Sequence, residues 1–185
     1  MEANFLNSSI KQFEYYKALG DKTLAQLSEE DLFHKLDEES NSIAVIVNHL
    51  NGNMLSRWTN FLTEDGEKDW RDRDNEFSDE IKTKAELIHK WEEGWMCLFK
   101  ALYSITPANF NRPIFIRNQQ HTIIEAFNRQ IGHYAYHVGQ MVLIGKHLKG
   151  NEWNSLSIPK GASNQFNKEK FERGKHGGHF TDDIK

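Results

Sequence analysis

Two histidines stand four residues apart in the segment His133-Tyr-Ala-Tyr-His137. If this segment is helical, both imidazoles project from one face about a turn apart and could bind the same metal ion. The chain has nine histidines and one cysteine, so a metal site here would use imidazole and carboxylate ligands rather than thiolate clusters. Such a pair also arises by chance, so the pair alone leaves a structural role open.

A third histidine, His49, lies near the middle of another apolar segment, between Val47 and Leu50. Histidines at the centres of two helices can meet inside a bundle, and three nitrogen ligands leave a position open for water or substrate, as in catalytic zinc sites. A lone His49 would more often be a core histidine held by hydrogen bonds, because an unsatisfied buried polar group costs ~1–3 kcal/mol. The three histidines together favour a metal site.

The remaining histidines and the cysteine are expected to have no part in this site. Cys97 lies between Met96 and Leu98 and is expected to be a small buried residue. A single cysteine excludes an intramolecular disulfide framework and fits a reducing, cytoplasmic setting. Six histidines are expected to be solvated, to precede a helix or to lie in the tail: His34, His89, His121, His147, His176 and His179.

Four long segments with apolar residues at helical spacing must position these side chains. They cover about residues 4–27, 42–63, 83–105 and 122–149. Thr122 with Glu125 forms a capping-box pattern at the start of the last segment, and Gly150 ends it. A short helix is expected over residues 29–35, and the tryptophans of the long segments are expected in the core. The pattern predicts an all-α protein, a four-helix bundle.

The connections differ in character. Residues 64–80 place nine acids and three bases in seventeen positions and are expected to form a loop packed down by Trp70 and Phe77. The acids at 72, 74 and 76 are spaced as in a calcium loop, but the required glycine is missing, so we reject that interpretation. This connection is long enough for a crossover. Residues 109–121 are expected to form a short extended connection.

The length of 185 residues predicts one domain. We assign residues 1–150 to the bundle and residues 151–185 to a C-terminal extension that packs on it, with a short helix over 164–173 and a loose end. The first twenty residues lack the features of a secretory signal, and no stretch is apolar enough to span a bilayer. The net charge of −4 gives no basic footprint for nucleic acid.

The order of these motifs resembles the DinB-like superfamily, which includes YfiT-like proteins, bacillithiol S-transferases and mycothiol-dependent maleylpyruvate isomerases. The resemblance spans about residues 4–150 and is carried by Val47-Asn-His49-Leu in the second long segment, then His133, His137 and Gly139-Gln140 in the fourth. Residues 65–77 and 156–161 also resemble a Bacillus-type subfamily of unknown function within it.

The resemblance implies a four-helix bundle with up-down-down-up topology and a divalent metal ion, nickel or zinc, held by His49, His133 and His137. It also implies a homodimer that acts on a small molecule. We expect a thiol S-transferase-like enzyme, in which the metal ion binds and deprotonates a low-molecular-weight thiol that attacks an electrophile. Gln140 or Arg129 could orient the substrate.

Two alternatives stay open. The first is a metal-dependent hydrolase, in which the ion lowers the pKa of bound water. No carboxylate is evident as its general base, because Glu125 lies two helical turns before His133. The second is a non-catalytic metal-binding stress protein, for which the acidic loop 64–80 and the tail would be partner surfaces.

Overall fold

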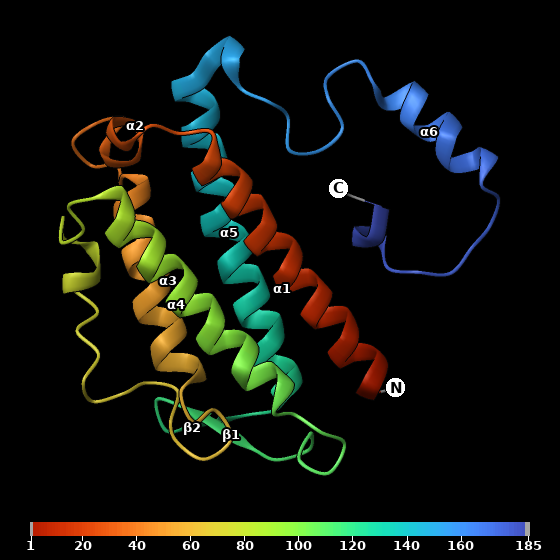
Figure 1. Cartoon of the computed structure of the whole chain (residues 1–185). Coiled ribbons are helices and arrows are strands. Elements are labelled where there is room, and N and C mark those ends of the chain that lie inside the picture. Colours follow the sequence, from red (N-terminus) through yellow and green to blue (C-terminus); the bar gives the residue numbers. More distant parts are fainter. Residues whose placement is uncertain (1, 184–185) are drawn as a thin grey trace.

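A computed structural model of the chain describes residues 2–183 and consists mainly of helices (Figure 1). This part of the chain contains helices α1 (Glu2–Ala25), α2 (Glu29–Phe33), α3 (Ile43–Trp58), α4 (Lys84–Tyr103), α5 (Ile123–Lys149) and α6 (Ser163–Glu172). Strands β1 (Ile114–Ile116) and β2 (Gln119–His121) form a small hairpin, and three short 3-10 helices are η1 (Asn75–Phe77), η2 (Gly150–Glu152) and η3 (Phe180–Asp183). The predicted all-α class is confirmed.

Side-chain caps begin the helices where the sequence predicts them. The Thr122 hydroxyl accepts a hydrogen bond from the backbone amide of Glu125, and the Glu125 carboxylate accepts one from the amide of Thr122. Ser42 and Thr83 begin α3 and α4 by accepting bonds from the amide three residues on. Each such cap is worth about 1 kcal/mol. The helix starts are therefore set by local interactions.

Helix α3 ends at Trp58, earlier than the predicted end near Thr63. Thr59 has an extended backbone with a ψ of 123°, which ends the helix, and Asn60 follows with a φ of 50°. The Ser56 hydroxyl donates a hydrogen bond of 2.8 Å to the carbonyl oxygen of Gly66 and so holds the following chain against the helix. Apolar periodicity could not show this end because the chain stays partly buried in the turn.

The four long helices lie side by side, with α3 next to α4 and α1 next to α5 (Figure 1). The colours in Figure 1 show that α1 and α5 run in one direction and that α3 and α4 run in the other. The long connection makes this possible by returning from the end of α3 to the start of α4. Aromatic side chains fill the space between the helices, and the largest fully buried ones include Phe13, Trp95, Phe127 and Tyr134.

Gly20 allows α1 to approach the side chain of Trp91 on α4. A Cβ atom at Gly20 would lie 2.3 Å from Cζ2 of Trp91, whose Nε1 is fixed by a hydrogen bond of 2.6 Å to Asp21. We expect Gly20→Ala to lower the free energy of unfolding by about 2 kcal/mol, because overpacking outweighs a gain of about 1 kcal/mol in helix propensity. Urea unfolding measures this change.

The matched control is Gly139→Ala, at an exposed helical glycine with no atom within 4 Å of the added Cβ. This variant should gain about 0.5–1 kcal/mol from helix propensity alone. Stabilisation of the protein by both substitutions would show that the contact between Gly20 and Trp91 does not limit the approach of α1.

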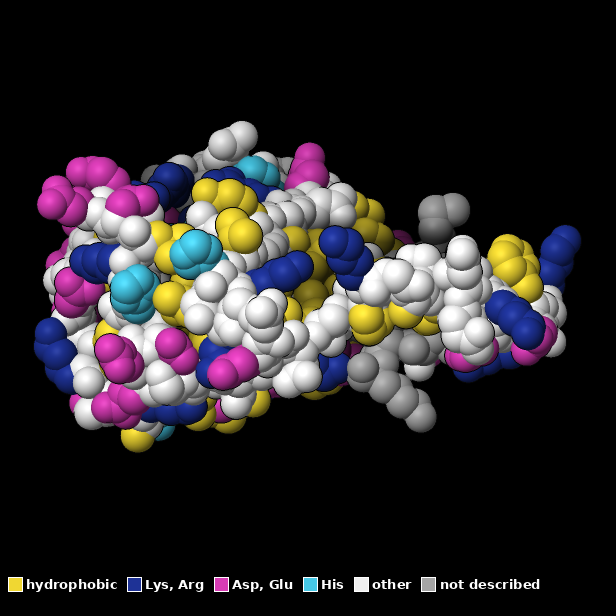
Figure 2. Space-filling view, turned by 90° about the horizontal axis from the view of Figure 1, so that it is seen from above, with side chains coloured by type: hydrophobic (Ala, Val, Ile, Leu, Met, Phe, Trp, Pro, Cys, Tyr) yellow, Lys and Arg dark blue, Asp and Glu magenta, His cyan; other side chains and the backbone are white. Residues whose placement is uncertain are grey.

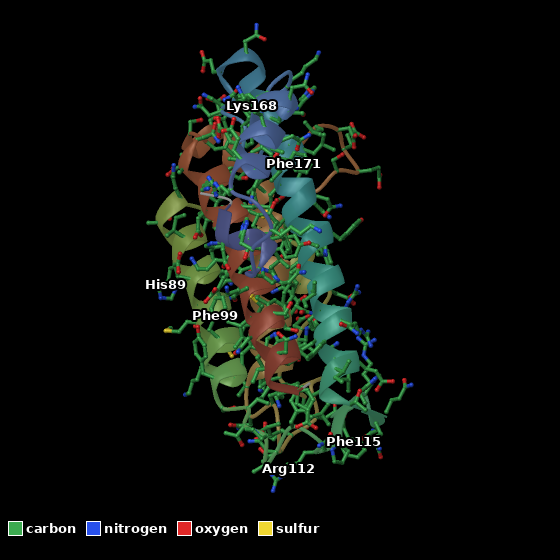
Figure 3. All side chains as sticks on the ribbon, turned by 90° about the vertical axis from the view of Figure 1, so that its right-hand side faces the viewer. His89, Phe99, Arg112, Phe115, Lys168 and Phe171 are labelled. Atoms are coloured by element: carbon green, nitrogen blue, oxygen red, sulfur yellow. The ribbon has the colours of Figure 1, made fainter. Side chains whose placement is uncertain are left out.

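The connection between α4 and α5 contains a hairpin, where the sequence predicts an extended segment. Ile114–Ile116 pairs antiparallel with Gln119–His121. The two linking residues, Arg117 and Asn118, have φ values of 56° and 59°, as a type I′ turn requires. Their amides donate hydrogen bonds of 2.8 Å to the carboxylate of Asp65, so the hairpin is tied to the start of the loop 64–80. Figure 3 shows this hairpin at one end of the long helices.

Charged side chains anchor the loop 64–80, whereas the sequence suggested its two aromatic residues. Trp70 is 59% exposed and Phe77 is 36% exposed. Lys68 and Glu76 are buried, and only 2% of the Arg71 side chain is exposed. Charged residues are seldom buried unless they are paired. The ion pairs of this loop are therefore part of the interior.

The C-terminal extension projects from the body formed by the long helices, and α6 stands apart from them (Figures 1 and 2). The extension contacts α1 near its beginning, where Asn154 donates to Gln26, and near its end, where Lys11 and Asp182 form an ion pair of 2.6 Å. The looseness expected of this end remains a prediction, and residues 184–185 lie outside the described residues. Among the described helices, none has the length and apolar character needed to cross a membrane.

Candidate metal centre

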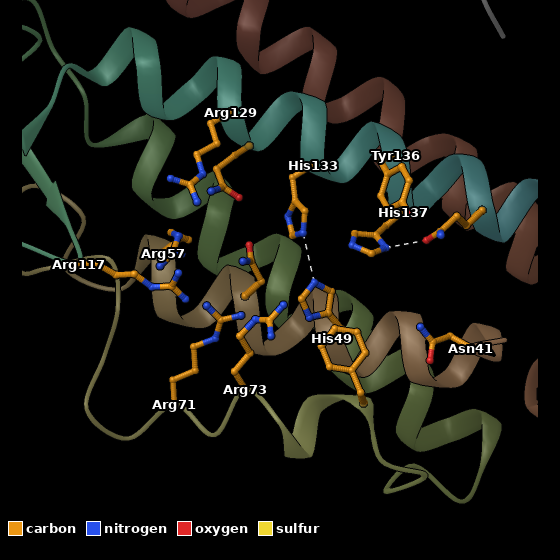
Figure 4. Close-up of a pocket in the computed structure, with 14 residues that line it drawn as sticks. Asn41, His49, Arg57, Arg71, Arg73, Arg117, Arg129, His133, Tyr136 and His137 are labelled. Atoms are coloured by element: carbon orange, nitrogen blue, oxygen red, sulfur yellow. Dashed lines mark hydrogen bonds between the residues drawn. The ribbon is translucent and has the colours of Figure 1, made fainter. Parts of the chain in front are cut away.

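His49, His133 and His137 lie close enough to one another to bind a single metal ion. His49 projects from the middle of α3, and the other two project from successive turns of α5 (Figure 4). Their candidate ligand nitrogens all lie within 4.8 Å of one another, and the two Nε2 atoms of His49 and His133 are 3.2 Å apart. The structure thus brings together the three residues that the sequence analysis selected.

The packing of α5 aims its two histidines at α3. Tyr134 follows His133 in the chain, is fully buried, and accepts a hydrogen bond of 2.9 Å from Nε1 of Trp58. This contact fixes the rotation of α5 about its axis, and His133 and His137 lie one turn apart on the neighbouring face. His49 comes from a helix that is buried along nearly its whole length and is itself only 3% exposed.

Two of the rings are oriented by hydrogen bonds on the nitrogen that faces away from the cluster. Nδ1 of His49 donates to Oε2 of Glu76 at 2.9 Å, and Nδ1 of His137 donates to Oε1 of Gln140 at 2.8 Å. A neutral imidazole that donates from Nδ1 carries its lone pair on Nε2. Partners of this kind fix the tautomer and orientation of metal-binding histidines.

Glu76 is held in place by Arg71, whose Nε and Nη2 atoms donate to its two carboxylate oxygens at 2.7 and 2.9 Å. Burial alone would raise the pKa of Glu76, but the hydrogen bonds from His49 and Arg71 hold this pKa below its ordinary value. Gly52 provides the space for the carboxylate, because a Cβ there would lie 2.4 Å from Oε1 of Glu76. Glu76 therefore stays ionised and accepts the hydrogen bond from His49.

The two histidines of α5 are neutral at neutral pH. Burial lowers the pKa of His133 to about 3 and that of His137 to about 4, and repulsion between the rings adds to the effect. Neutral imidazole is the form that binds metal ions. Nδ1 of His133 is buried and has no hydrogen-bond partner among the described residues. Unsatisfied buried nitrogens are rare in structural cores.

The chemistry of the donors fits a divalent ion of the later transition series. Three neutral imidazoles suit zinc, nickel and copper, whereas magnesium and calcium prefer oxygen ligands. Histidine ligands of such ions usually donate their other ring nitrogen to a carboxylate or carbonyl oxygen, as His49 does to Glu76. The residues present are therefore able to hold the kind of ion that the sequence analysis expects.

A cavity of about 680 Å³ opens beside the three histidines, within the size range of small-molecule sites. Phe77 stacks on the His49 ring with a centroid distance of 4.6 Å and forms part of the wall. Gln140, one of the two side chains expected to orient a substrate, also lines it. The wall includes five arginines (Figure 4): Arg57, Arg71, Arg73, Arg117 and Arg129.

Glu76 and the arginines of the loop 64–80 were not predicted from the sequence. Glu76 appeared only in a rejected calcium pattern, and Arg71 was one of three bases in an acidic loop. The available signal was the presence of these bases between the acids, since each could neutralise a carboxylate in the interior. Glu125 caps α5 and does not line the cavity.

The other histidines and Cys97 do not join the cluster. Cys97 is half-buried, and burial raises the pKa of its thiol, which agrees with the expected passive role. His121 is half-buried, and its Nε2 has no hydrogen-bond partner among the described residues. His179 lies 3.2 Å from the Ser8 hydroxyl on α1. As expected, three histidines are exposed on the surface: His34, His89 and His147.

Comparison with known proteins yields a family match. The family model described as "Protein of unknown function (DUF1572)" matches residues 1–162, which include all four long helices and the three clustered histidines. No curated protein and no solved structure shows a significant match.

Proposed function

We propose that this chain, which belongs to the DUF1572 family of proteins of unknown function, is a divalent-metal-dependent enzyme of the DinB-like type. The observation that carries this proposal is the convergence of three imidazoles on the wall of a cavity of small-molecule size. Catalytic zinc sites use three protein ligands and an open position, whereas structural sites use four. The directions of the long helices fit the up-down-down-up bundle that the resemblance implies.

The metal of this proposal is zinc or nickel. A bound ion would supply Lewis-acid chemistry that favours the deprotonated form of a coordinated thiol or water. Glu76 and Gln140 hold the imidazoles of His49 and His137 in position through their Nδ1 atoms. Phe77 covers one face of the His49 ring and shields it from solvent.

Thiol transfer is the reaction that the cavity supports best. The part of the wall that the structure describes has no carboxylate to act as a general base for hydrolysis, and Glu76 is occupied by His49 and Arg71. Cys97 does not line the cavity. The nucleophile would therefore be a low-molecular-weight thiol, and we infer that the protein acts as a cytoplasmic homodimer on a small electrophile.

The loop 64–80 weighs against a purely non-catalytic role. In that alternative, the acidic loop would be a partner surface, yet Glu67 and Glu76 pair with arginines of the cavity wall. The loop thus serves the cavity. A metal-binding protein without catalysis needs neither a cavity of this size nor arginines held in place along its wall.

The test measures conjugation of small thiols to a test electrophile by zinc-loaded and nickel-loaded protein. We expect turnover with at least one thiol, and we expect chelation or His133→Ala to abolish it. His89→Ala, at an exposed histidine, should behave as the wild-type protein does. Turnover of esters or amides without a thiol would favour the hydrolase, and stoichiometric metal without any turnover would favour the non-catalytic alternative.

A further inference from the structure

The wall of the cavity beside the histidines has a charge opposite to that of the whole chain. The chain has a formal net charge of −4. The described wall nevertheless includes five arginines and neither aspartate nor glutamate. A concave site lined by charges of one sign raises the local concentration of ligands of the other sign.

Nearby carboxylates neutralise only part of this charge. Arg71 forms its paired hydrogen bonds with Glu76. Glu67 is approached by three guanidinium groups, at 3.0 Å by Arg57, at 3.3 Å by Arg71 and at 3.3 Å by Arg117. Two carboxylates thus form ion pairs with three of the arginines, and Asp65 also attracts Arg57, so the positive charge that remains is that of the other two arginines.

Arg73 and Arg129 form no ion pair with any residue between 2 and 182. The Arg73 guanidinium lies over the Phe77 ring, 5.4 Å from its centroid, and Phe77 stacks on His49. Arg129 lies one turn before His133 on α5. The two unpaired guanidinium groups therefore lie close to the candidate metal ligands, Arg73 through Phe77 and Arg129 on the same helix as His133.

The arginines come from four separate parts of the chain. Arg57 is on α3, Arg71 and Arg73 are in the loop 64–80, Arg117 is in the hairpin turn and Arg129 is on α5. Figure 4 shows them gathered on one side of the histidines. Single exposed arginines need no explanation, but convergence of four segments on one wall concentrates like charges, and a bound anion would reduce the repulsion that the two glutamates leave.

We propose that Arg73 and Arg129, with Arg57, Arg71 and Arg117 behind them, form a binding subsite for an oxyanion carried by the small molecule that enters the cavity. The guanidinium fork matches the geometry of carboxylate, phosphate and sulfonate groups. The anionic group lies on the arginine side, and the reacting end of the molecule faces the three histidines. This inference rests on the proposed function in taking the cavity as the substrate site, and it makes the substrate class anionic.

The experiment follows the arginine side-chain Nε–H signals by NMR while phosphate, methanesulfonate or acetate is added. Dimethyl sulfone is the neutral counterpart of methanesulfonate. We expect at least one anion to bind and dimethyl sulfone not to bind, and the tightest anion identifies the oxyanion. The double substitution Arg73→Gln/Arg129→Gln should weaken binding about tenfold or more, because hydrogen bonds between charged groups are the strong ones.

The matched control is Arg112→Gln, at an exposed arginine near the hairpin that does not line this cavity (Figure 3). It should leave the anion affinity unchanged. Arg73 and Arg129 are also exposed, so the double variant should keep the wild-type melting temperature.

The titrations are made with metal-free and with zinc-loaded protein. Binding to the metal-free protein would support the subsite even if no reaction is found, so the two proposals can fail separately. Three results would overturn the subsite: no binding of any anion, equal binding of dimethyl sulfone, or unchanged affinity in the double variant. An anion that binds only to zinc-loaded protein, with equal affinity in the double variant, would be a ligand of the ion.

Discussion

Replacement of His137 by alanine should abolish stoichiometric zinc or nickel binding and lower the affinity by more than about a hundredfold. Loss of a residue that only hydrogen-bonds to a metal ligand typically costs about 10–100-fold in metal affinity, so loss of one of the three ligands should cost more. His137 suits this test because its orienting partner, Gln140, is only partly buried and can hydrogen-bond to water after the substitution. The fold should therefore survive.

Metal analysis and competition with a chelator measure the affinity, and thermal unfolding gives an independent readout. A ligand at about 100 times its dissociation constant stabilises the native state by about 2.7 kcal/mol. Added zinc should therefore raise the melting temperature of the wild-type protein but not that of His137→Ala. His89→Ala, at an exposed histidine of α4 labelled in Figure 3, should respond as the wild type does. Stoichiometric zinc in His137→Ala would remove this residue from the site.

The features that could be predicted from sequence are those that local interactions determine. Thr122 and Glu125 specify the start of α5 within four residues, and the apolar stripe that follows sets which face is buried. His133 and His137 share a face because of helical geometry alone. The convergence of His49 on them needed one further assumption, that α3 and α5 lie together in a bundle, which the apolar pattern of the long segments favoured and the resemblance to a known family also implies.

The partners of the site could not be predicted because they come from segments without periodicity. Glu76 contacts His49 across 27 positions of the chain, through a loop whose path depends on ion pairs. The sequence predicted an acidic loop packed down by its two aromatic residues. In the structure, Glu67 and Glu76 are counter-ions for buried guanidinium groups, which a count of charges does not reveal.

The same reasoning explains the early end of α3. The apolar pattern continues to Phe61, which is indeed buried. The chain nevertheless leaves the helix at Thr59, and Ser56 and Arg57 both donate hydrogen bonds to the Gly66 carbonyl oxygen, which hold the following turn in place. A residue can thus fill a core position from a turn as well as from a helix, and periodicity does not distinguish the two cases.

The Glu76→Gln substitution should lower the free energy of unfolding by about 3 kcal/mol. Glutamine keeps the size of the side chain but removes the charge that faces Arg71, whose side chain is only 2% exposed. Removal of one partner of a buried ion pair costs about 3–5 kcal/mol, because the other charge is left buried. Glu67 remains 3.3 Å from Arg71, so the lower end of this range is expected.

Urea unfolding of metal-free protein measures this loss separately from any change in metal binding. Asp79→Asn is the matched control, because Asp79 pairs with Lys35 at the surface of the same loop and exposed pairs contribute only about 0–1 kcal/mol. The double variant Arg71→Met/Glu76→Gln should regain part of the stability, since it leaves no unpaired guanidinium in the interior. If Glu76→Gln is as stable as Asp79→Asn, the Arg71–Glu76 pair does not anchor the loop, and the orientation of His49 must come from its packing against Phe77.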